Sequence, residues 1–576
     1  MFARVLCSVL SLLIAAQVYA DSLPSNDMGH YASVDINGAA ATVHPLATRA
    51  AMDALDNGGT AIDAAIAAAV TLGVVDGHNS GIGGGNFAVV RWADGQIEAL
   101  DGREQAPLAA RHDMFVRKGK GDIQLSTTGP LAVGIPGSVA VYQYMHNRGG
   151  KLAWQDLILP AANLAQDGFV LSASTAGRIV RTAKKIRRFP ATSKIFLDAD
   201  QQPLAAGVLL KQQDLANSYR LLAKQGGEYF YRGDFAKRVA AWMADNGGII
   251  TADDFANYQM RIRQPTVSEY RGYQIVGFPP PSSGGVHVAQ ILNILENFDL
   301  RSLDEVTRYH ILAEAMQLAF ADRAYFLGDP DFVPVPRGLM DKRYGQQLAA
   351  KINPKKSAAK VEHGTPPNAD IDLFGKHTTH ISVADKLGNW VAITTTVNTS
   401  FGSKVIVPGT GVVLNNQMDD FSTQPGIPNA FGLVGNQANS VQPSKRPLSS
   451  MSPTLVLKKG EPVMSLGAAG GPTIITQVVQ TLVNVIDLDM DAEKALAAQR
   501  IHHQWLPEVL FVENAMPETL QAALKARGHS LHSRGFAGAT QLILRNSKGE
   551  MTAASEPRVI AQNKKAKQQA RLKVIQ

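Results

Sequence analysis

The sequence predicts a mixed α+β protein, and three observations support this fold class. The 576 residues are 45% hydrophobic and 18% charged, an ordinary balance for a globular chain that buries a sizeable core. An early apolar helix pattern leads through a glycine-rich turn into a strand. A later segment alternates in hydrophobicity like a β-hairpin. Predominant disorder and a coiled coil are disfavoured, and the length fits about three to five small units or one large layered fold.

Residues 1–20 have the layout of a secretory signal peptide. Arg4 supplies a positive charge, Val5 to Val18 is largely apolar, and Ala20 ends a segment with small residues where a signal peptidase cuts. A retained membrane anchor is the alternative, but the apolar run is shorter than the ~20 residues that a spanning helix needs. We expect an exported protein, periplasmic or secreted. Because Cys7, the single cysteine, lies in this segment, the mature chain has no disulfide and no cysteine nucleophile.

Two helices and a strand are expected next. Pro45 to Asp56 has a helical pattern that ends at a glycine pair. Thr60 caps a second helix, with Asp63 three residues further on as in a capping box. The turn Ser80–Gly85 then leads into a strand over Phe87–Trp92. This order, turn to strand, does not match a dinucleotide-binding fingerprint.

The middle of the chain alternates helical patterns with loops and then changes character. Tyr309 to Leu327 is a long helical candidate. Residues 353–377 contain several prolines and glycines without sustained periodicity, so we expect a flexible linker. His377–Val383 and Trp390–Val397 then alternate on either side of a turn and predict a hairpin. The linker thus enters a sheet at a threonine.

Polar loops follow strands in the C-terminal third. The first, residues 415–421, comes after a predicted strand over Val412–Leu414. The second, residues 445–453, precedes another strand. The third, residues 467–472, lies between a strand and a helix predicted over Thr473–Ile486. Each could be a simple turn, but polar loops gathered at strand ends are typical of a binding site.

The net charge of +7 is concentrated at the C-terminus. Residues 562–576 carry five positive charges and no acidic residue, which leaves about +2 for the rest of the chain. No aromatic residues interleave with these charges. We therefore expect a solvated, frayed tail rather than an arm that binds nucleic acid.

Thr378 has a chemical role only if the preceding peptide bond is cut. A free α-amine has a pKa near 7.7–8.0, so at neutral pH a useful fraction is an unprotonated base. One residue would then hold both a nucleophilic hydroxyl and its general base. The alternative is that Thr378 and Thr379 are simply strand-forming residues.

Four strings of residues connect the chain to a known family: Thr378–Val383, Asn415–Phe421, Arg446–Pro453 and His503–Pro507. In the order and the residues of these strings, the chain resembles the gamma-glutamyltranspeptidases, also called glutathione hydrolases, of the N-terminal nucleophile hydrolase superfamily. The resemblance runs from about Gly38 to Arg558.

The resemblance implies a precursor that cuts itself between His377 and Thr378. A large subunit, residues 21–377, and a small subunit, residues 378–576, would stay together as a heterodimer in one αββα sandwich. Thr378 would attack the γ-glutamyl amide of glutathione or a related compound, and the ester would be resolved by water, an amino acid or a dipeptide. No cofactor, metal or nucleic acid is implied, and no membrane association after the signal is removed.

The resemblance also assigns a role to each matching residue. Gly470 and Gly471 would donate backbone N–H groups to the oxyanion, and Thr396 would hydrogen-bond the nucleophile. The substrate's α-carboxylate would be held by a guanidinium, which suits a planar, two-pronged contact, together with two hydroxyl groups. Its α-ammonium would meet oxygen acceptors. These substrate-binding residues are Arg103, Ser449 and Ser450 for the carboxylate, and Asp420, Asn398 and Gln417 for the ammonium.

Other interpretations of these residues are a surface ion pair for Arg103, a turn cap for Ser449 or Ser450, and a supporting contact for Gln417. For Asp420 we expect substrate contact, since a carboxylate distinguishes an amino-acid head from a plain glutaryl group.

The chain departs from the family's pattern in places. Phe431 stands in the loop that resembles the family's lid, where many relatives have tyrosine, so a hydroxyl that would hold the lid to Asn398 is missing. Ala468 and Ala469 replace a commoner Ser-Pro before the oxyanion glycines. His502 and His503 are adjacent, and neighbours in an extended segment point to opposite faces, so structural roles are expected rather than a metal site.

Two rivals from other classes remain. The first is a related acylase that acts on glutaryl or poly-γ-glutamyl amides, against which Asp420 with Arg103 argues. The second is an exported solute-binding protein without catalysis, which would remain one intact polypeptide.

Overall fold

The computed structural model describes residues 30–334, 336–358, 361–366, 379–422, 424, 429–430, 433, 437–535 and 538–564. The predicted signal peptide, His377, Thr378 and Phe431 lie outside these residues. So do parts of the predicted linker and most of the predicted tail.

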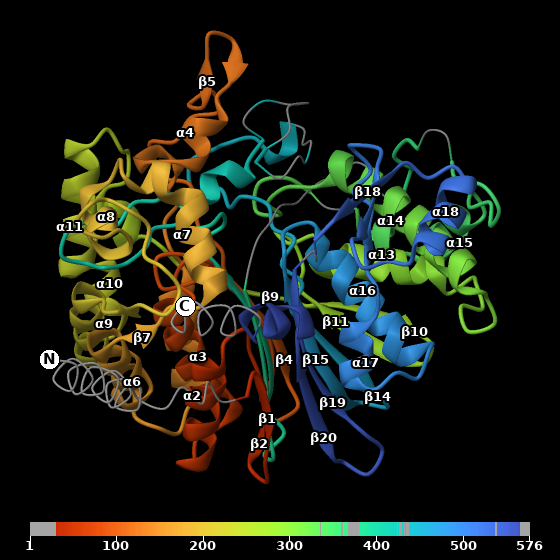
Figure 1. Ribbon diagram of the computed structural model, residues 1–576, viewed down its shortest axis with the longest axis horizontal. Coiled ribbons are helices and arrows are strands. Elements are labelled where there is room, and N and C mark those ends of the chain that lie inside the picture. The colour runs from red at the N-terminus through yellow and green to blue at the C-terminus, as the bar shows by residue number, and fades with distance from the viewer. Residues whose placement is uncertain are drawn as a thin grey trace, which may run out of the picture.

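Two antiparallel sheets face each other between two layers of helices (Figure 1). The first sheet has the strand order β1-β2-β12-β13-β3-β4-β9. Its strands in that order are Ala32–Val34, Gly38–Ala41, Thr379–Asp385, Trp390–Thr396, Gly85–Arg91, Ile97–Gly102 and Arg261–Arg263. The second sheet has the order β10-β11-β14-β15-β19-β20. Its strands are Thr266–Tyr270, Tyr273–Gly277, Thr454–Lys458, Glu461–Ala469, Ala539–Arg545 and Met551–Ser555.

Short strands form three smaller sheets at the periphery. They are β5 (Val116–Arg117) with β6 (Lys120–Gly121), β7 (Phe169–Val170) with β8 (Leu209–Leu210), and β16 (Ile501–His502) with β17 (Leu510–Glu513) and β18 (Leu531–Arg534).

The space between the two large sheets is filled from alternate positions of their strands. Phe87 and Val89 of β3 point toward the second sheet, whereas Ala88 and Val90 point toward the helices, as the two-residue period of a strand requires. The rings of Phe87 and Phe278 stack across the interface with centroids 4.0 Å apart. This contact ties the two sheets together.

Helices from the first half of the chain form the layer on the outer face of the first sheet. They are α2 (Pro45–Asp56), α3 (Ala61–Val75), α5 (Ser138–Gly149), α6 (Trp154–Asp167), α7 (Ala173–Ile186), α8 (Pro190–Phe196), α9 (Gln213–Gln225), α10 (Gly227–Tyr231), α11 (Asp234–Asp245) and α12 (Ala252–Ala256). Of these, α2, α3 and α5 pack directly on the strands of the sheet, and the others pack around these helices. The short helix α4 (Ile123–Thr127) lies near β5, at the top of this layer in Figure 1.

A second set of helices covers the outer face of the second sheet. They are α13 (Gly284–Leu295), α14 (Glu305–Phe326), α15 (Lys342–Ala349), α16 (Thr473–Ile486), α17 (Ala492–Ala497) and α18 (Glu518–Ala526). Helix, sheet, sheet and helix form four layers, so the predicted α+β class and αββα sandwich are confirmed.

Most local elements agree with the sequence. The helix over Pro45–Asp56 has the predicted bounds, and Thr60 forms the expected capping box with Asp63. The hairpin of β12 and β13 and the helix α16 are also present. In the described part of the chain, no helix is long and apolar enough to cross a membrane.

One local prediction is wrong. Residues 412–414 are not a strand, because their pairing with residues 403–406 extends no further than one isolated bridge between Val413 and Ile406. Of the predicted tail, residues 562–576, the structure describes 562–564, which end a helix over residues 557–564; there the Asn563 Nδ2 donates to the Tyr31 hydroxyl over 2.9 Å. The rest of the tail lies outside the described residues.

Candidate active site

The first described residue after the predicted scission point opens onto a large cavity. Thr379 starts β12 and donates a hydrogen bond from its Oγ1 to the Asp76 Oδ2 over 3.1 Å. A cavity of about 770 Å³ is lined by Thr379, Asn398, Gly470 and residues of α7, among others. We call it the Thr379 cavity. Its volume lies in the range of small-molecule sites, about 300–1,000 Å³.

A glycine turn forms part of the wall of this cavity. Gly470 and Gly471 have φ values of +131° and +69°, in the region that favours glycine. A Cβ on Gly470 would lie 2.5 Å from the Thr473 Oγ1 and 2.9 Å from the Gly538 Cα. Neither backbone N–H donates to another residue that the structure describes. The glycine turn therefore offers two N–H groups, as an oxyanion site requires.

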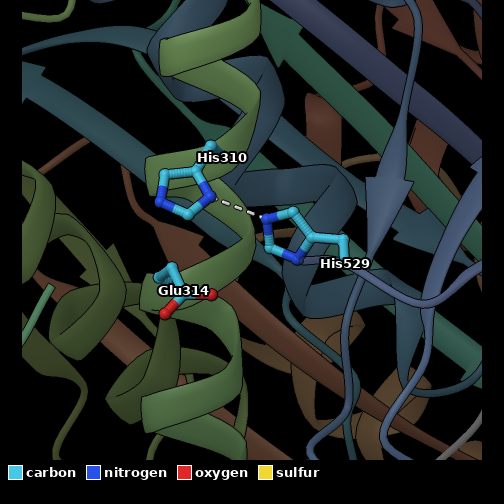
Figure 2. Close-up of side chains that lie close together, drawn as sticks. All are labelled: His310, Glu314 and His529. Atoms are coloured by element: carbon cyan, nitrogen blue, oxygen red, sulfur yellow. Dashed lines mark hydrogen bonds between the residues drawn. The ribbon is translucent and has the colours of Figure 1, made fainter. Parts of the chain in front are cut away.

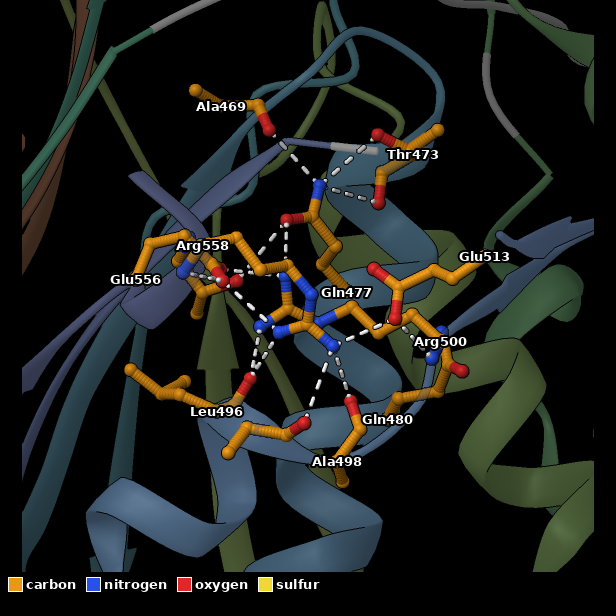
Figure 3. Close-up of polar contacts among 12 residues, drawn as sticks. Ala469, Thr473, Gln477, Gln480, Leu496, Ala498, Arg500, Glu513, Glu556 and Arg558 are labelled. Atoms are coloured by element: carbon orange, nitrogen blue, oxygen red, sulfur yellow. Dashed lines mark hydrogen bonds and ion pairs between the residues drawn. The ribbon is translucent and has the colours of Figure 1, made fainter. Parts of the chain in front are cut away.

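Gln477 of α16 holds this turn from below, as Figure 3 shows. Its Nε2 donates to the Ala469 carbonyl over 2.9 Å and to the Thr473 Oγ1 over 3.0 Å. Its Oε1 accepts from the Arg500 Nη1 over 3.3 Å, and the same nitrogen forms an ion pair with Glu556 at 2.6 Å. One side chain thus connects the glycine turn to a buried charged network.

Arg103 and Asp420 form a buried ion pair outside the lining of the Thr379 cavity. The Arg103 Nη2 lies 2.6 Å from the Asp420 Oδ2 and donates to the Leu448 carbonyl over 2.8 Å. Its Nε donates to the Pro447 carbonyl, also over 2.8 Å. The guanidinium is fully buried and is oriented by backbone carbonyls. A surface ion pair, the alternative role considered for Arg103, is excluded by this burial.

Two further side chains complete this group, which we call the Arg103 cluster: Arg103, Glu104, Gln417 and Asp420. With its amide oriented to satisfy both neighbours, Gln417 accepts from the Arg103 Nη1 over 3.1 Å and donates to the Glu104 Oε1 over 3.3 Å. Burial raises the pKa of Glu104 to about 8, although Arg103 acts to lower it. The cluster combines one cation with acceptor oxygens, which suits an amino-acid head group.

A second ion pair fixes the loops that carry this cluster. The Arg446 Nη1 lies 2.7 Å from the Asp101 Oδ2, and both side chains are buried. Asp101 and Arg446 belong to different halves of the chain, two residues before Arg103 and one residue before Pro447. The pair therefore holds the two backbone segments that orient the Arg103 guanidinium.

Asn398 lies between the cavity and the buried residues. It has a φ of +77°, and its N–H donates to the Thr396 Oγ1 over 2.7 Å. Its Nδ2 donates to the Asn416 carbonyl over 2.9 Å. The Asn398 Oδ1 is buried and accepts no hydrogen bond from the described residues. An unused buried acceptor facing a cavity is costly unless a ligand or water satisfies it.

Ser449 and Ser450 are buried in a tight loop beside α13. The Ser449 Oγ accepts from the Met451 N–H over 3.1 Å, a local contact of the kind that a turn cap makes. The Ser450 Oγ accepts from the Ser283 Oγ over 3.4 Å. Both hydroxyls already have partners.

Comparison with known proteins identifies the family. A family model described as gamma-glutamyltranspeptidase matches residues 47–566. The chain belongs to this family. The glutathione hydrolase proenzyme of Escherichia coli (strain K12) is 42% identical over 528 residues, which cover 91% of this chain and 90% of that relative.

Solved structures of related enzymes support the same family. Cephalosporin acylase from Bacillus halodurans matches with a TM-score of 0.82 and 29% identity, covering 93% of this chain and 96% of that one. Gamma-glutamyltranspeptidase from Helicobacter pylori matches with a TM-score of 0.55 and 38% identity, covering 59% of this chain and 97% of that one. The family predicted from the sequence motifs is confirmed, and so is the prediction of an enzyme.

Five of the predicted site residues fall into two groups. Of these residues, Asn398 and Gly470 line the Thr379 cavity. Arg103, Gln417 and Asp420 lie together in the buried cluster instead. The predicted site therefore has an open part, the Thr379 cavity, and a buried part, the Arg103 cluster, and Asn398 lies at the boundary between them.

Three charged residues near the site were missed by sequence reasoning. Asp76 contacts Thr379, and burial raises the pKa of its carboxyl to about 7. Glu104 belongs to the Arg103 cluster. Arg323 is buried, its Nη2 has no hydrogen-bond partner among the described residues, and burial lowers the pKa of its guanidinium to about 9 although Asp420 acts to raise it. Glu104 could have been found from its place directly after Arg103; the other two carry no motif signal.

Histidines outside this site have hydrogen-bonding roles. The His502 Nδ1 lies 3.0 Å from the Thr476 Oγ1, and the His503 Nδ1 accepts from the Trp505 N–H over 3.1 Å.

A separate group, His310, Glu314 and His529, lies between α14 and the loop before β18 (Figure 2). The His310 Nδ1 and the His529 Nε2 are 2.7 Å apart, and Glu314 accepts from the Ser357 hydroxyl over 2.9 Å. The Glu314–Ser357 bond, with a contact of 2.8 Å between the His310 Nε2 and the Asn353 carbonyl oxygen, fastens the start of the predicted linker to α14.

Proposed function

We propose that the chain is an exported γ-glutamyltranspeptidase and glutathione hydrolase that matures by cutting itself between His377 and Thr378. The large and small subunits, residues 21–377 and 378–576, would remain associated. Family membership supports the activity. The observation that most supports the site is that Thr379, the residue after the proposed nucleophile, and Gly470 line the same cavity.

In this mechanism the Thr378 Oγ attacks the γ-carbonyl carbon of the donor, and the free α-amine of Thr378 accepts the hydroxyl proton. The negative charge that develops on the carbonyl oxygen is stabilised by the N–H groups of Gly470 and Gly471. When the tetrahedral intermediate collapses, the C–N bond breaks and the proton passes to the leaving amine. An ester between the glutamyl group and Thr378 remains.

The second half reverses these steps. Water or the amine of an amino acid or peptide attacks the ester carbon, and its proton returns through the α-amine to the Thr378 oxygen as the C–O bond breaks. Hydrolysis releases glutamate, and transfer releases a new γ-glutamyl amide. Thr396 would orient the nucleophile, and Phe431 would belong to a lid that shields the ester.

The glutamyl head group would be held by the Arg103 cluster. Arg103, with Ser449 and Ser450, would bind the α-carboxylate. Asp420, with Asn398 and Gln417, would bind the α-ammonium. The unused Asn398 Oδ1 supports this assignment, because an ammonium donor would satisfy it.

The deciding experiment combines a denaturing gel with N-terminal sequencing. Active protein should show two fragments, and the smaller one should begin Thr-Thr-His. Thr378→Ala should abolish both scission and turnover. An uncut but fully active Thr378→Ala protein would refute the mechanism.

A second candidate is an acylase that removes glutaryl or poly-γ-glutamyl groups, which the similarity to a cephalosporin acylase favours. The pairing of Asp420 with Arg103 argues for a substrate that carries a free amino-acid head. Hydrolysis rates of γ-glutamyl and glutaryl anilides separate the two activities. A clear preference for the glutaryl compound would select the acylase.

A further inference from the structure

The Thr379 cavity has one wall that the proposed chemistry does not use. Thr379, Asn398 and Gly470 lie on the side of the reacting centre. Helix α7 contributes Ser174, Arg178 and, among others, Arg181 to the lining. Residues spaced by three and four positions share one face of a helix, so the two guanidinium groups point into the same space.

Both arginines lack an acidic partner in the described part of the chain. The Arg178 Nη1 donates to the Ser400 Oγ over 3.2 Å, and neither guanidinium forms an ion pair with a described carboxylate. Both side chains are exposed. Partial desolvation and then the charge of Arg181 lower the pKa of Arg178, and Asp76 acts in the opposite direction, so the two guanidinium groups repel each other. Two neighbouring cations that form no ion pair with a described carboxylate favour the binding of an anion.

The rest of the lining does not neutralise this charge. Asp76 is the one acidic residue among the described lining residues, and burial raises the pKa of its carboxyl to about 7. His44 and His78 also line the cavity, and burial lowers their pKa values to about 4 and about 3, so both are neutral at pH 7. The cavity is therefore positive at neutral pH. The N-terminal end of α7, at Ser172 and Ala173, adds the positive end of a helix dipole.

We propose that Arg178 and Arg181 bind the carboxylate of the amine half of the substrate. This is the amino acid or short peptide that leaves when a γ-glutamyl amide is cleaved, and the one that enters when the glutamyl group is transferred. The inference rests on the proposed function. A single guanidinium can hold a carboxylate through two parallel hydrogen bonds, and a second one nearby adds charge, which gives both affinity and orientation.

The layout of the site supports this direction of binding. The scissile carbonyl would lie at the glycine turn, with the glutamyl head directed toward the buried Arg103 cluster. The amine half then has to extend from the carbonyl into open space, and the Thr379 cavity is the open space beside Gly470. Its volume of about 770 Å³ lies in the range of small-molecule sites, which is large enough for an amino acid or a short peptide.

The test compares two donors that differ only in this carboxylate: glutathione, and glutathione whose C-terminal carboxylate is an amide. In Arg178→Ala/Arg181→Ala, we expect the ratio of kcat/KM for glutathione to kcat/KM for the amide to fall about tenfold or more, since a hydrogen bond to a charged group contributes at least that factor. The matched control is Lys184→Ala, which removes an exposed charge from the same helix outside the cavity. Its ratio should equal that of the wild type.

Salt gives a second measurement. Because exposed charges are screened over about 8–10 Å at physiological ionic strength, the preference of the wild type for glutathione should shrink as salt rises, and the double variant should show no such trend.

Equal losses on both donors would overturn the proposal, because they would assign the arginines to folding or to the reacting centre. An unchanged ratio would also overturn it. Failure of the proposed function is seen separately, as a wild-type protein that cleaves neither donor.

Discussion

At the scale of single residues, the orientation of the Arg103 guanidinium is set by its hydrogen-bond partners. Two backbone carbonyls and Asp420 fix its plane. Arg103→Lys keeps the charge but replaces a planar fork by a point charge. We expect KM for a γ-glutamyl anilide to rise about tenfold, the value of one lost hydrogen bond to a charged group, with a smaller change in kcat.

Steady-state kinetics measures this change, and thermal unfolding of the same variant checks that the fold is intact. A KM equal to that of the wild type would remove Arg103 from the substrate site.

Asp76 gives a prediction about pH. Burial raises the pKa of its carboxyl to about 7, against hydrogen bonds from Thr379 and Asn79 and the charge of Arg178. Below pH 7 the carboxyl is neutral; above pH 7 it is ionised and offsets Arg178 and Arg181 in the same cavity. KM for glutathione should therefore rise as pH increases from about 6 to about 8.

Asp76→Asn cannot ionise and should lose this rise, while glutathione amide should show little of it with either protein. The measurement is KM as a function of pH for the two donors. If both proteins gave the same profile with glutathione, Asp76 would have no influence on the cavity.

The site residues that could be predicted from the sequence belong to local motifs, whereas missed residues such as Asp76 are brought to the site only by folding. Asp420 lies in one of the strings that the family shares, and Arg103 and Gly470 match positions of the family, so the resemblance identifies all three. Asp76 ends the helix α3 about 300 positions before Thr379 in the chain, and only the folded structure brings the two within 3.1 Å. A contact between segments so far apart leaves no local pattern in the sequence.

At the scale of elements, the glycine turn depends on the helix that follows it. The turn has two glycines at positive φ and lacks a proline before them, so its conformation needs support from elsewhere. Gln477, one turn into α16, supplies hydrogen bonds to Ala469 and Thr473 (Figure 3). The turn and the helix behave as one unit.

Gln477→Ala should therefore misplace the oxyanion donors without removing them. Loss of a whole donor costs about 10²–10³ in kcat, so we expect a smaller loss of about tenfold in kcat with KM little changed. Gln480→Ala is the control, because Gln480 lies one turn further on and bonds the Ile501 backbone instead of the glycine turn. A loss in KM alone, or the same kinetic loss in the control, would contradict a positioning role.

The interface between the sheets gives a prediction about stability. Phe278 is fully buried and stacks on Phe87 across the two sheets. Phe278→Ala should lower the free energy of unfolding by about 3–5 kcal/mol, the usual cost of a large cavity in a core. Val267→Ala, on the exposed face of the neighbouring strand β10, should change it by less than about 0.5 kcal/mol. Urea denaturation of both variants measures the difference.

Local elements were predictable and their arrangement was not. The capping box of α3 and the alternation of the hairpin are encoded within a few residues. The order of strands in the first sheet is not, since β2 and β12 are adjacent although more than 300 residues separate them. The αββα sandwich could be expected only through the resemblance to a family.

At the scale of the whole molecule, the proposed scission point divides the chain but not the fold. The first sheet places β12 and β13, from after residue 378, between β2 and β3, from before it. In the second sheet β11 pairs with β14 in the same manner. Each half therefore supplies strands to both sheets, and neither half has a complete core of its own.

This interleaving predicts how the cleaved protein behaves. Size-exclusion chromatography without denaturant should give one species at the same elution volume before and after scission, whereas a denaturing gel should give two bands. Thr378→Ala should elute with the cleaved protein but remain one band. Because the buried strands of the two fragments pair edge to edge, separating them should require the urea concentration that unfolds the whole molecule. Two fragments that separate below that concentration would mean that the shared sheets do not hold the halves together.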